Sequence, residues 1–255
     1  MLVDPGPESC VETLLAALGD ARPRALLLTH IHLDHAGASG ALVRRWPDLE
    51  VHVHEVGAPH MADPSKLLAS ASRLYGEDMD RLWGEVVPVP EQNLRVLTGG
   101  EHVDGFRVAH TPGHASHHVC YLHEESGTAF VGDVAGVRIP PASFVVPPTP
   151  PPEIDLEAWR SSLDVVAGWE PAALAMTHFG ANEGAAAQLE AMRERLAAWG
   201  EHARRMDEPT FVERVHAEVL DAADPEAAAR YEQAAPAEQL WQGLERYWRK
   251  RADPG

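Results

Sequence analysis

The sequence predicts an α+β fold, a sandwich of two β-sheets flanked by helices, with a small all-helical extension at its C-terminal end. The first part of the chain alternates short apolar runs with segments whose apolar residues recur at helical spacing. Residues 94–131 then carry several short strand patterns separated by turns, and the chain after residue 207 is rich in Ala and Glu. We therefore expect a main domain over residues 1–205 and a helical extension over 206–255.

The first third of the chain predicts strands and helices in turn. A strand ends in the turn Asp4-Pro-Gly, and the apolar run at 25–28 is typical of a buried strand. The polar cluster that begins at Thr29 follows this run directly, in a loop just past a strand end. The other elements expected here are helices at 8–18 and 37–46, a strand at 50–54 and helical turns over 56–82.

The middle of the chain predicts short strands, and the rest of it mainly helices. Pro147–Pro152 is a stiff, proline-rich stretch that cannot join a sheet ladder, so we expect a loop. Helix breaks are expected in the extension at Asp224-Pro and Ala235-Pro. The remaining elements are expected as strands at 94–97, 106–110, 119–123, 128–131 and 172–176, and as helices at 156–169 and 182–205.

The charge balance is strongly acidic. Lys and Arg number 21 against 39 Asp and Glu, a formal charge of −18. Because a binder of nucleic acids or anionic membranes needs a basic face, we predict neither as a partner and expect a small-molecule substrate. A local basic patch could still exist, for instance around Arg44 and Arg45 or over Arg246–Arg251. No apolar run is long enough to span a bilayer and no signal-peptide pattern opens the chain, so the predicted location is the cytoplasm.

Cysteine usage is sparse, and the sequence assigns no oligomeric state. Cys10 and Cys120 are too few for a disulfide framework and lack the spacing of a metal finger. We expect both to be free, buried thiols.

The main candidate for chemistry is a cluster of metal-ligand residues, His30, His32, Asp34 and His35. On a short loop, alternate residues point the same way, so His30 and His32 can converge on one ion. Imidazole and carboxylate are ligands that zinc, iron and manganese accept. A single histidine is more often a satisfied core residue, but crowding four such groups without a metal is costly, and this favours a metal site.

Three later strand ends each deliver another ligand-type residue. His114 lies in Thr111-Pro-Gly-His after the strand at 106–110, and Asp133 follows an apolar strand in Phe130-Val-Gly-Asp. His178 lies in Met176-Thr-His-Phe-Gly, after the strand at 172–176. Four separate strand ends thus supply metal ligands, which is the strongest functional signal in the sequence.

Together these motifs resemble a known family. Thr-His-Ile-His-Leu-Asp-His at 29–35 is similar to the HxHxDH signature of the metallo-β-lactamase superfamily, and the three later motifs follow in the family's order over roughly residues 1–205. The resemblance implies an αββα sandwich with a dinuclear metal site. By this resemblance the first metal is held by His30, His32 and His114, the second by Asp34, His35 and His178, and Asp133 bridges both.

The resemblance also implies a mechanism. Two divalent ions, zinc with iron or manganese as alternatives, generate a bridging hydroxide that attacks the substrate, and Asp34 orients this nucleophile and shuttles its proton. Small esters, thioesters and lactones are the expected substrates, in the manner of the glyoxalase II-like group. His110, His118 and Asp4 are candidates to orient the ligands, and His117 is expected to be exposed.

Two other functions stay open, a mononuclear iron sulfur dioxygenase of the same superfamily and a non-catalytic metal-binding module. The seven ligand-type residues argue against the module and only mildly against the dioxygenase. The stretch from Ala135 to Pro141 lacks the pattern typical of hydroxyacylglutathione hydrolases and persulfide dioxygenases, which puts glutathione-thioester specificity in doubt. Relatives usually carry one or two strands before the first strand seen here, so we expect a truncated start or a short first sheet with an exposed edge.

Overall fold

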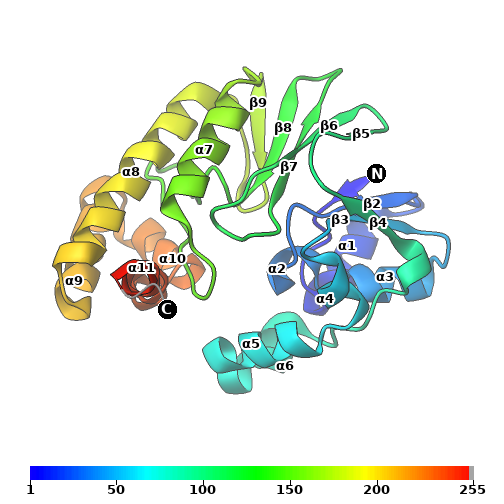
Figure 1. Cartoon of the computed structure of the whole chain (residues 1–255), viewed down its shortest axis with the longest axis horizontal. Coiled ribbons are helices and arrows are strands. Elements are labelled where there is room, and N and C mark those ends of the chain that lie inside the picture. Colours follow the sequence, from blue (N-terminus) through cyan, green and yellow to red (C-terminus); the bar gives the residue numbers. More distant parts are fainter. Residues whose placement is uncertain (253–255) are drawn as a thin grey trace. The chain divides into compact units, whose positions relative to one another are not determined.

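A computed structural model of the chain describes residues 1–252 (Figure 1). It contains two β-sheets. The first has the order β1 (Leu2–Val3), β2 (Ala25–Leu27), β3 (Glu50–His54), β4 (Leu94–Leu97). The second has the order β10 (Gly180–Asn182), β9 (Ala173–Met176), β8 (Thr128–Gly132), β7 (Val119–His123), β6 (Phe106–His110), β5 (His102–Val103). The chain forms two compact units: residues 1–110 with 117–121, and residues 111–116 with the chain from 122 onward. The domain boundary predicted at residue 205 stays a prediction.

The first unit is built on a parallel four-stranded sheet. Each pair of neighbouring strands in this sheet is parallel, with Leu26 in register with Val51 and Val53 in register with Val96. The carboxyl ends of parallel strands meet at one edge of a sheet, which brings the loops after the first two strands together. The first of these loops holds Asp4 and the second holds Thr29. The strands are β1 (Leu2–Val3), β2 (Ala25–Leu27), β3 (Glu50–His54) and β4 (Leu94–Leu97).

Short helices complete the core of this unit. Leu26, Val51 and Val53 are fully buried, and Leu42 of α3 (Ser39–Arg45) belongs to the same apolar cluster. The helix expected at 37–46 is present as one helix over Ser39–Arg45, whereas the helical stretches expected at 8–18 and 56–82 are each divided into shorter pieces. The α-helices are α1 (Val11–Leu18), α2 (Leu33–Ala36), α3 (Ser39–Arg45), α4 (Ala58–Ala62), α5 (Ser65–Tyr75) and α6 (Met79–Trp83).

Three further strands follow. β5 (His102–Val103) and β6 (Phe106–His110) form an antiparallel hairpin. The start of β7 (Val119–His123) is fixed on the end of β2, because the Val119 amide donates to the Thr29 carbonyl at 2.7 Å and the Tyr121 hydroxyl donates to the Leu28 carbonyl at 2.7 Å. The strand predictions at 50–54, 94–97, 106–110 and 119–123 are confirmed residue for residue.

The second unit places two parallel strands beside a pair of helices. β8 (Thr128–Gly132) runs parallel to β9 (Ala173–Met176), with Gly132 in register with Met176. Both strands therefore end at the same edge, one residue before Asp133 and two before His178. α7 (Leu156–Ala167) and α8 (Ala185–Arg205) pack side by side in Figure 1. β10 (Gly180–Asn182) was not expected from the sequence, which predicts a helix from residue 182.

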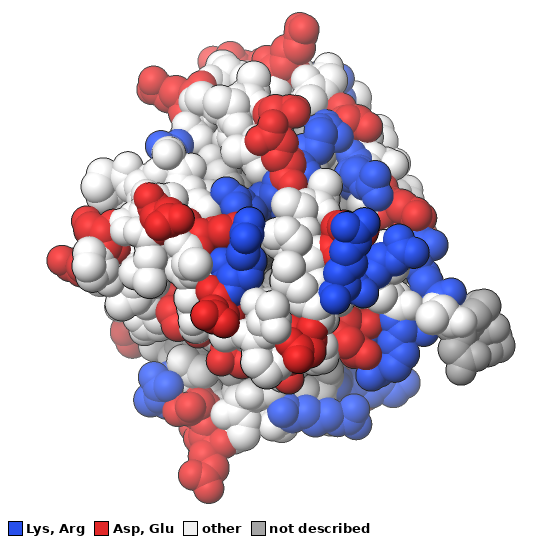
Figure 2. Space-filling view, turned by 90° about the vertical axis from the view of Figure 1, so that its left-hand side faces the viewer, with Lys and Arg blue, Asp and Glu red and all other residues white. Residues whose placement is uncertain are grey.

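The C-terminal part of the second unit is helical, as predicted. α9 (Glu208–Ala222), α10 (Pro225–Ala234) and α11 (Ala237–Ala252) are separated at the two expected breaks. The Asp207 and Asp224 side chains cap the first two of these helices, each with Pro in the first turn. Figure 2 shows Lys and Arg side chains interspersed with Asp and Glu on this face. Within residues 1–252 no helix combines the length and apolar character needed to cross a bilayer.

One cysteine prediction is wrong. Cys120 is buried in β7, but Cys10 is exposed. Cys10 lies at the junction between a single 3-10 turn and α1, two segments without any fully buried residue, so its side chain stays at the surface.

Candidate metal centre

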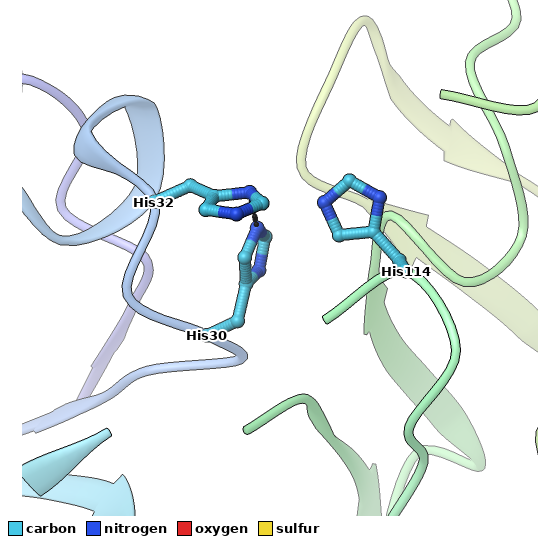
Figure 3. A group of neighbouring side chains, drawn as sticks. All are labelled: His30, His32 and His114. Carbon is cyan, nitrogen blue, oxygen red and sulfur yellow. Dashed lines mark hydrogen bonds between the residues drawn. The ribbon is translucent and has the colours of Figure 1, made fainter. Parts of the chain in front are cut away.

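The first ligand set lies at the carboxyl edge of the parallel sheet, on the loop after β2. The His30 Nε2 and His32 Nδ1 atoms lie 2.9 Å apart and form a hydrogen bond (Figure 3). His30 Nδ1 lies 3.1 Å from Thr29 Oγ1, and that hydroxyl donates its proton to Asp4. The hydroxyl can therefore only accept from His30, so Nδ1 of His30 carries the proton and its Nε2 offers a lone pair.

Asp4 organises this set. Its carboxylate accepts from the Thr29 amide at 2.8 Å and from the Thr29 hydroxyl at 2.7 Å, and it lies 2.9 Å from His35 Nδ1. The backbone of Asp4 has φ +45°, a region that Asp tolerates better than most residues. A carboxylate that accepts from His35 Nδ1 leaves the lone pair of His35 on Nε2, the atom that could coordinate a metal ion. Asp4 thus contacts His35, as expected for a residue that orients it, and the role of His35 as a metal ligand stays a prediction.

His35 and Asp34 form the second pair of donors in this set. His35 Nε2 lies 3.4 Å from Asp34 Oδ2, and the His35 side chain is fully buried whereas the Asp34 side chain is about one-third exposed. Two ligands that each lie about 2.0–2.1 Å from a tetrahedral zinc ion are about 3.3 Å apart. The separation of this pair is therefore that of two ligands on one ion.

Three histidines near the first set have different surroundings. The buried His118 ring stacks on His30 with a centroid distance of 5.0 Å. His117 was expected to be exposed, but it is buried, because its Nδ1 approaches the Ile31 amide at 3.5 Å and its ring lies parallel to that of His30. The His110 ring stacks on His54, the last residue of β3, at 4.1 Å.

In the second unit, His114 is held in one orientation. Its Nδ1 lies 2.8 Å from the Pro148 carbonyl oxygen, which can only accept, so Nδ1 carries the proton and Nε2 offers a lone pair. The neighbouring Gly113 has φ +139°, and a Cβ there would overlap the backbone of Trp159. The Trp159 ring packs edge-on against His114, and its indole N–H donates to the Val134 carbonyl.

Asp133 lies between two imidazoles. One carboxylate oxygen is 3.3 Å from His114 Nε2, and the other is 3.4 Å from His178 Nε2. These two separations match the ligand-to-ligand distance at a tetrahedral ion, with one oxygen assigned to each imidazole. Asp133 and His114 are buried, whereas the His178 side chain is about 30% exposed. A bridging carboxylate requires this type of arrangement.

Sequence reasoning missed two groups that bear on the site. The Tyr75 hydroxyl at the end of α5 is affected by burial and by the nearby Asp34 carboxylate, which together raise its pKa to about 12. It therefore stays a protonated hydrogen-bond donor at neutral pH. The Pro148 carbonyl is the second, and no side-chain pattern could have indicated it.

Comparison with known proteins decides the family. The profile of the metallo-β-lactamase superfamily matches residues 1–178. The chain belongs to this superfamily. A hydroxyacylglutathione hydrolase of Legionella pneumophila is 30% identical over 131 residues, which are 51% of this chain and 41% of the relative. The chain thus spans about two-fifths of the length of that enzyme.

Solved structures confirm the fold. Similarity to the archaeal superfamily protein ST1585 from Sulfolobus tokodaii covers 89% of this chain and 82% of the other, with a TM-score of 0.64 and 24% identity. TTHA1623, solved in a di-iron-bound form, is 31% identical over 72% of this chain and 85% of its own, with a TM-score of 0.57. The predicted αββα metallo-β-lactamase fold with a helical C-terminal region is confirmed, and proteins of this fold bind divalent metals.

Proposed function

We propose that the chain is a dinuclear metal-dependent hydrolase that acts on a small ester, thioester or lactone. The observation that carries the proposal is the paired geometry of the donors. His35 with Asp34, and Asp133 with both His114 and His178, lie at the spacing of ligands on a shared ion. In the proposed site His30, His32 and His114 would hold the first ion, Asp34, His35 and His178 would hold the second, and Asp133 would be shared between them.

The protonation pattern of the ligands fits metal ions. His30, His35 and His114 each present Nδ1 to an oxygen of Thr29, Asp4 or Pro148. Metal-bound histidines normally donate their second N–H in this manner, which fixes the tautomer and the ring direction. The donor set of imidazole and carboxylate suits zinc, iron and manganese, and we propose zinc for the ions of this chain.

When bound, two divalent ions supply a hydroxide nucleophile near neutral pH and polarise the carbonyl group of an acyl substrate. Asp34 is proposed as the catalytic residue that orients this nucleophile and relays its proton. Its partly exposed carboxylate can exchange that proton with solvent, whereas the buried Asp133 cannot do so readily.

The proposed substrate is a small, uncharged or weakly charged acyl compound. A formal charge of −18 disfavours nucleic acids and anionic membranes, so these are not proposed as partners. The similarity to hydroxyacylglutathione hydrolases, which covers about half of this chain, supports a thioester or a related acyl bond as the first group to test.

Elemental analysis of protein purified without added metal tests the proposal. We expect about two zinc ions per chain in the wild type and about one in each of the variants His114→Ala and His178→Ala. His216→Ala is the matched control, because His216 lies on α9 and pairs with Glu232. An ester, thioester and lactone screen follows on the zinc-loaded protein.

Other outcomes of the same analysis redirect the proposal. About one iron per chain, lost in His114→Ala but retained in His178→Ala, would support the mononuclear sulfur dioxygenase. No specifically bound metal in the wild type would reject both functions.

A further inference from the structure

The orientation of His114 depends on a proline-rich segment that lies 34 residues further along the chain. The Pro148 carbonyl oxygen lies 2.8 Å from His114 Nδ1, inside the second unit. Because the carbonyl can only accept, its position selects the tautomer of His114 and the direction in which Nε2 points. Whatever fixes Pro148 therefore also fixes a proposed metal ligand.

The segment around Pro148 has few means of holding itself in place. Pro147, Pro148 and the three prolines at 150–152 have no backbone N–H, so they cannot donate to a sheet ladder. The last ladder contact before them is the isolated bridge between Val137 and Val146. The conformation of the segment must therefore be set by contacts from other elements.

Helix α11 supplies one group of these contacts. The fully buried Thr149 hydroxyl donates to the Leu240 carbonyl at 3.0 Å. Gly243, one turn further on, faces the Thr149 carbonyl so closely that an added Cβ would overlap its oxygen. Glycine disfavours a helix interior relative to alanine, so its presence here is explained by this close approach.

Helix α10 supplies the second group. The Tyr231 hydroxyl donates to the Phe144 carbonyl at 2.7 Å and accepts from the Ile139 amide at 2.9 Å. Burial raises the pKa of Tyr231, so its hydroxyl remains a donor at neutral pH. The buried Tyr231 hydroxyl therefore links Ile139 to Phe144, on the stretch that precedes the proline-rich segment.

We propose that the C-terminal helices are positioning elements for the metal ligand His114. Contacts from α11 to Thr149, and from Tyr231 of α10, hold the segment 139–149 so that the Pro148 carbonyl directs Nε2 of His114. The inference rests on the proposed function, in which His114 binds an ion. Thr149, Gly243 and Tyr231 themselves are positioning residues and do not contact the metal.

The test compares zinc affinity in variants that move or release the segment. Gly243→Ala pushes against the Thr149 carbonyl, and Thr149→Val removes one hydrogen bond while conserving shape. Gly200→Ala is the control for the first, because its Cβ would meet only the movable Leu156 side chain. Thr128→Val, on β8, is the control for the second. Competition with a chromophoric chelator measures the affinity, and the melting temperature of each metal-free protein reports its folding.

In both test variants we expect one zinc ion to bind about tenfold more weakly than in the wild type, with the second ion little affected. The controls should match the wild type. A second readout is the ¹⁵N NMR signature of the His114 ring in metal-free protein, which should show a protonated Nδ1 in the wild type and a mixture of tautomers in both test variants.

Three results separate the possible failures. Wild-type affinity and an unchanged His114 tautomer in both test variants would overturn the positioning role while leaving the proposed hydrolase intact. Equal weakening in the controls would also overturn it, since general destabilisation would then be the cause. A wild-type protein that binds no zinc would instead reject the proposed function and, with it, the inference.

Discussion

The two sets of candidate metal ligands are held in place by different kinds of contact. In the first unit, His30 and His35 are oriented by the side chains of Thr29 and Asp4, which lie on adjacent loops of the parallel sheet. In the second unit, His114 is oriented by a main-chain carbonyl on a segment that distant helices hold. A histidine can therefore be oriented by neighbouring side chains or by a backbone carbonyl whose position depends on distant helices. In the second case, a substitution far from the site can change the orientation of the histidine.

Removal of the charge between the two imidazoles of the second set should have the largest effect. We expect Asp133→Asn to weaken zinc binding by more than about 100-fold, because the carboxylate lies within 3.4 Å of both His114 and His178. Isothermal titration of metal-free protein measures this. Asp164→Asn, at an exposed carboxylate that pairs with Arg193, is the control. Unchanged zinc affinity in Asp133→Asn would contradict the bridging role.

The backbone support of the second set predicts a stability effect. Gly113→Ala should lower the free energy of unfolding by about 2–4 kcal/mol, because it combines an unfavourable φ with overlap at Trp159. Gly105→Ala also has a positive φ but open space around its Cβ, so it should cost only about 1 kcal/mol. Urea unfolding separates the two. Equal costs would show that the contact with Trp159 contributes nothing.

The side-chain support of the first set predicts a smaller loss. In Asp4→Asn an amide replaces a carboxylate that faces three donors, so the free energy of unfolding should fall by about 1–3 kcal/mol and zinc affinity by about tenfold. Asp104→Asn is a matched control, since Asp104 also has a positive φ but pairs with the exposed Arg24. If both variants behave alike, Asp4 does not organise the ligands.

The smallest expected effect is a pH dependence of the first unit. Burial, with the nearby His110, lowers the pKa of His54, so the unfolded chain binds a proton more readily than the folded one. The stability contributed by neutral His54 is present above pH about 6.5 and is lost as the pH falls below it. His54→Gln should reduce the slope of unfolding free energy between pH 7 and 5, by at most about 1.4 kcal/mol per pH unit. An unchanged slope in His54→Gln would contradict the lowered pKa of His54 in the folded chain.

Local sequence patterns predict part of the fold and of the candidate site, and miss the features that depend on tertiary packing. The strands and their ligand-bearing ends follow from apolar periodicity and turn residues, and the role of Asp4 follows from its place after the first strand. The burial of His117 and the short strand β10 depend on which segments pack together, and local patterns do not encode this. The Pro148 carbonyl and the contact of Gly243 with Thr149 involve backbone atoms, which no residue type marks.

The proposed function requires that His30 and His114 bind one ion, and the zinc content of double variants tests this most directly. If His30 and His114 share one ion, the double variant His30→Ala/His114→Ala should keep about one zinc per chain, as each single variant does. His30→Ala/His178→Ala removes a ligand from each ion and should keep none. A His30→Ala/His114→Ala protein that retains no zinc, while each single variant retains one, would show that the two sets bind separate ions and would contradict the account.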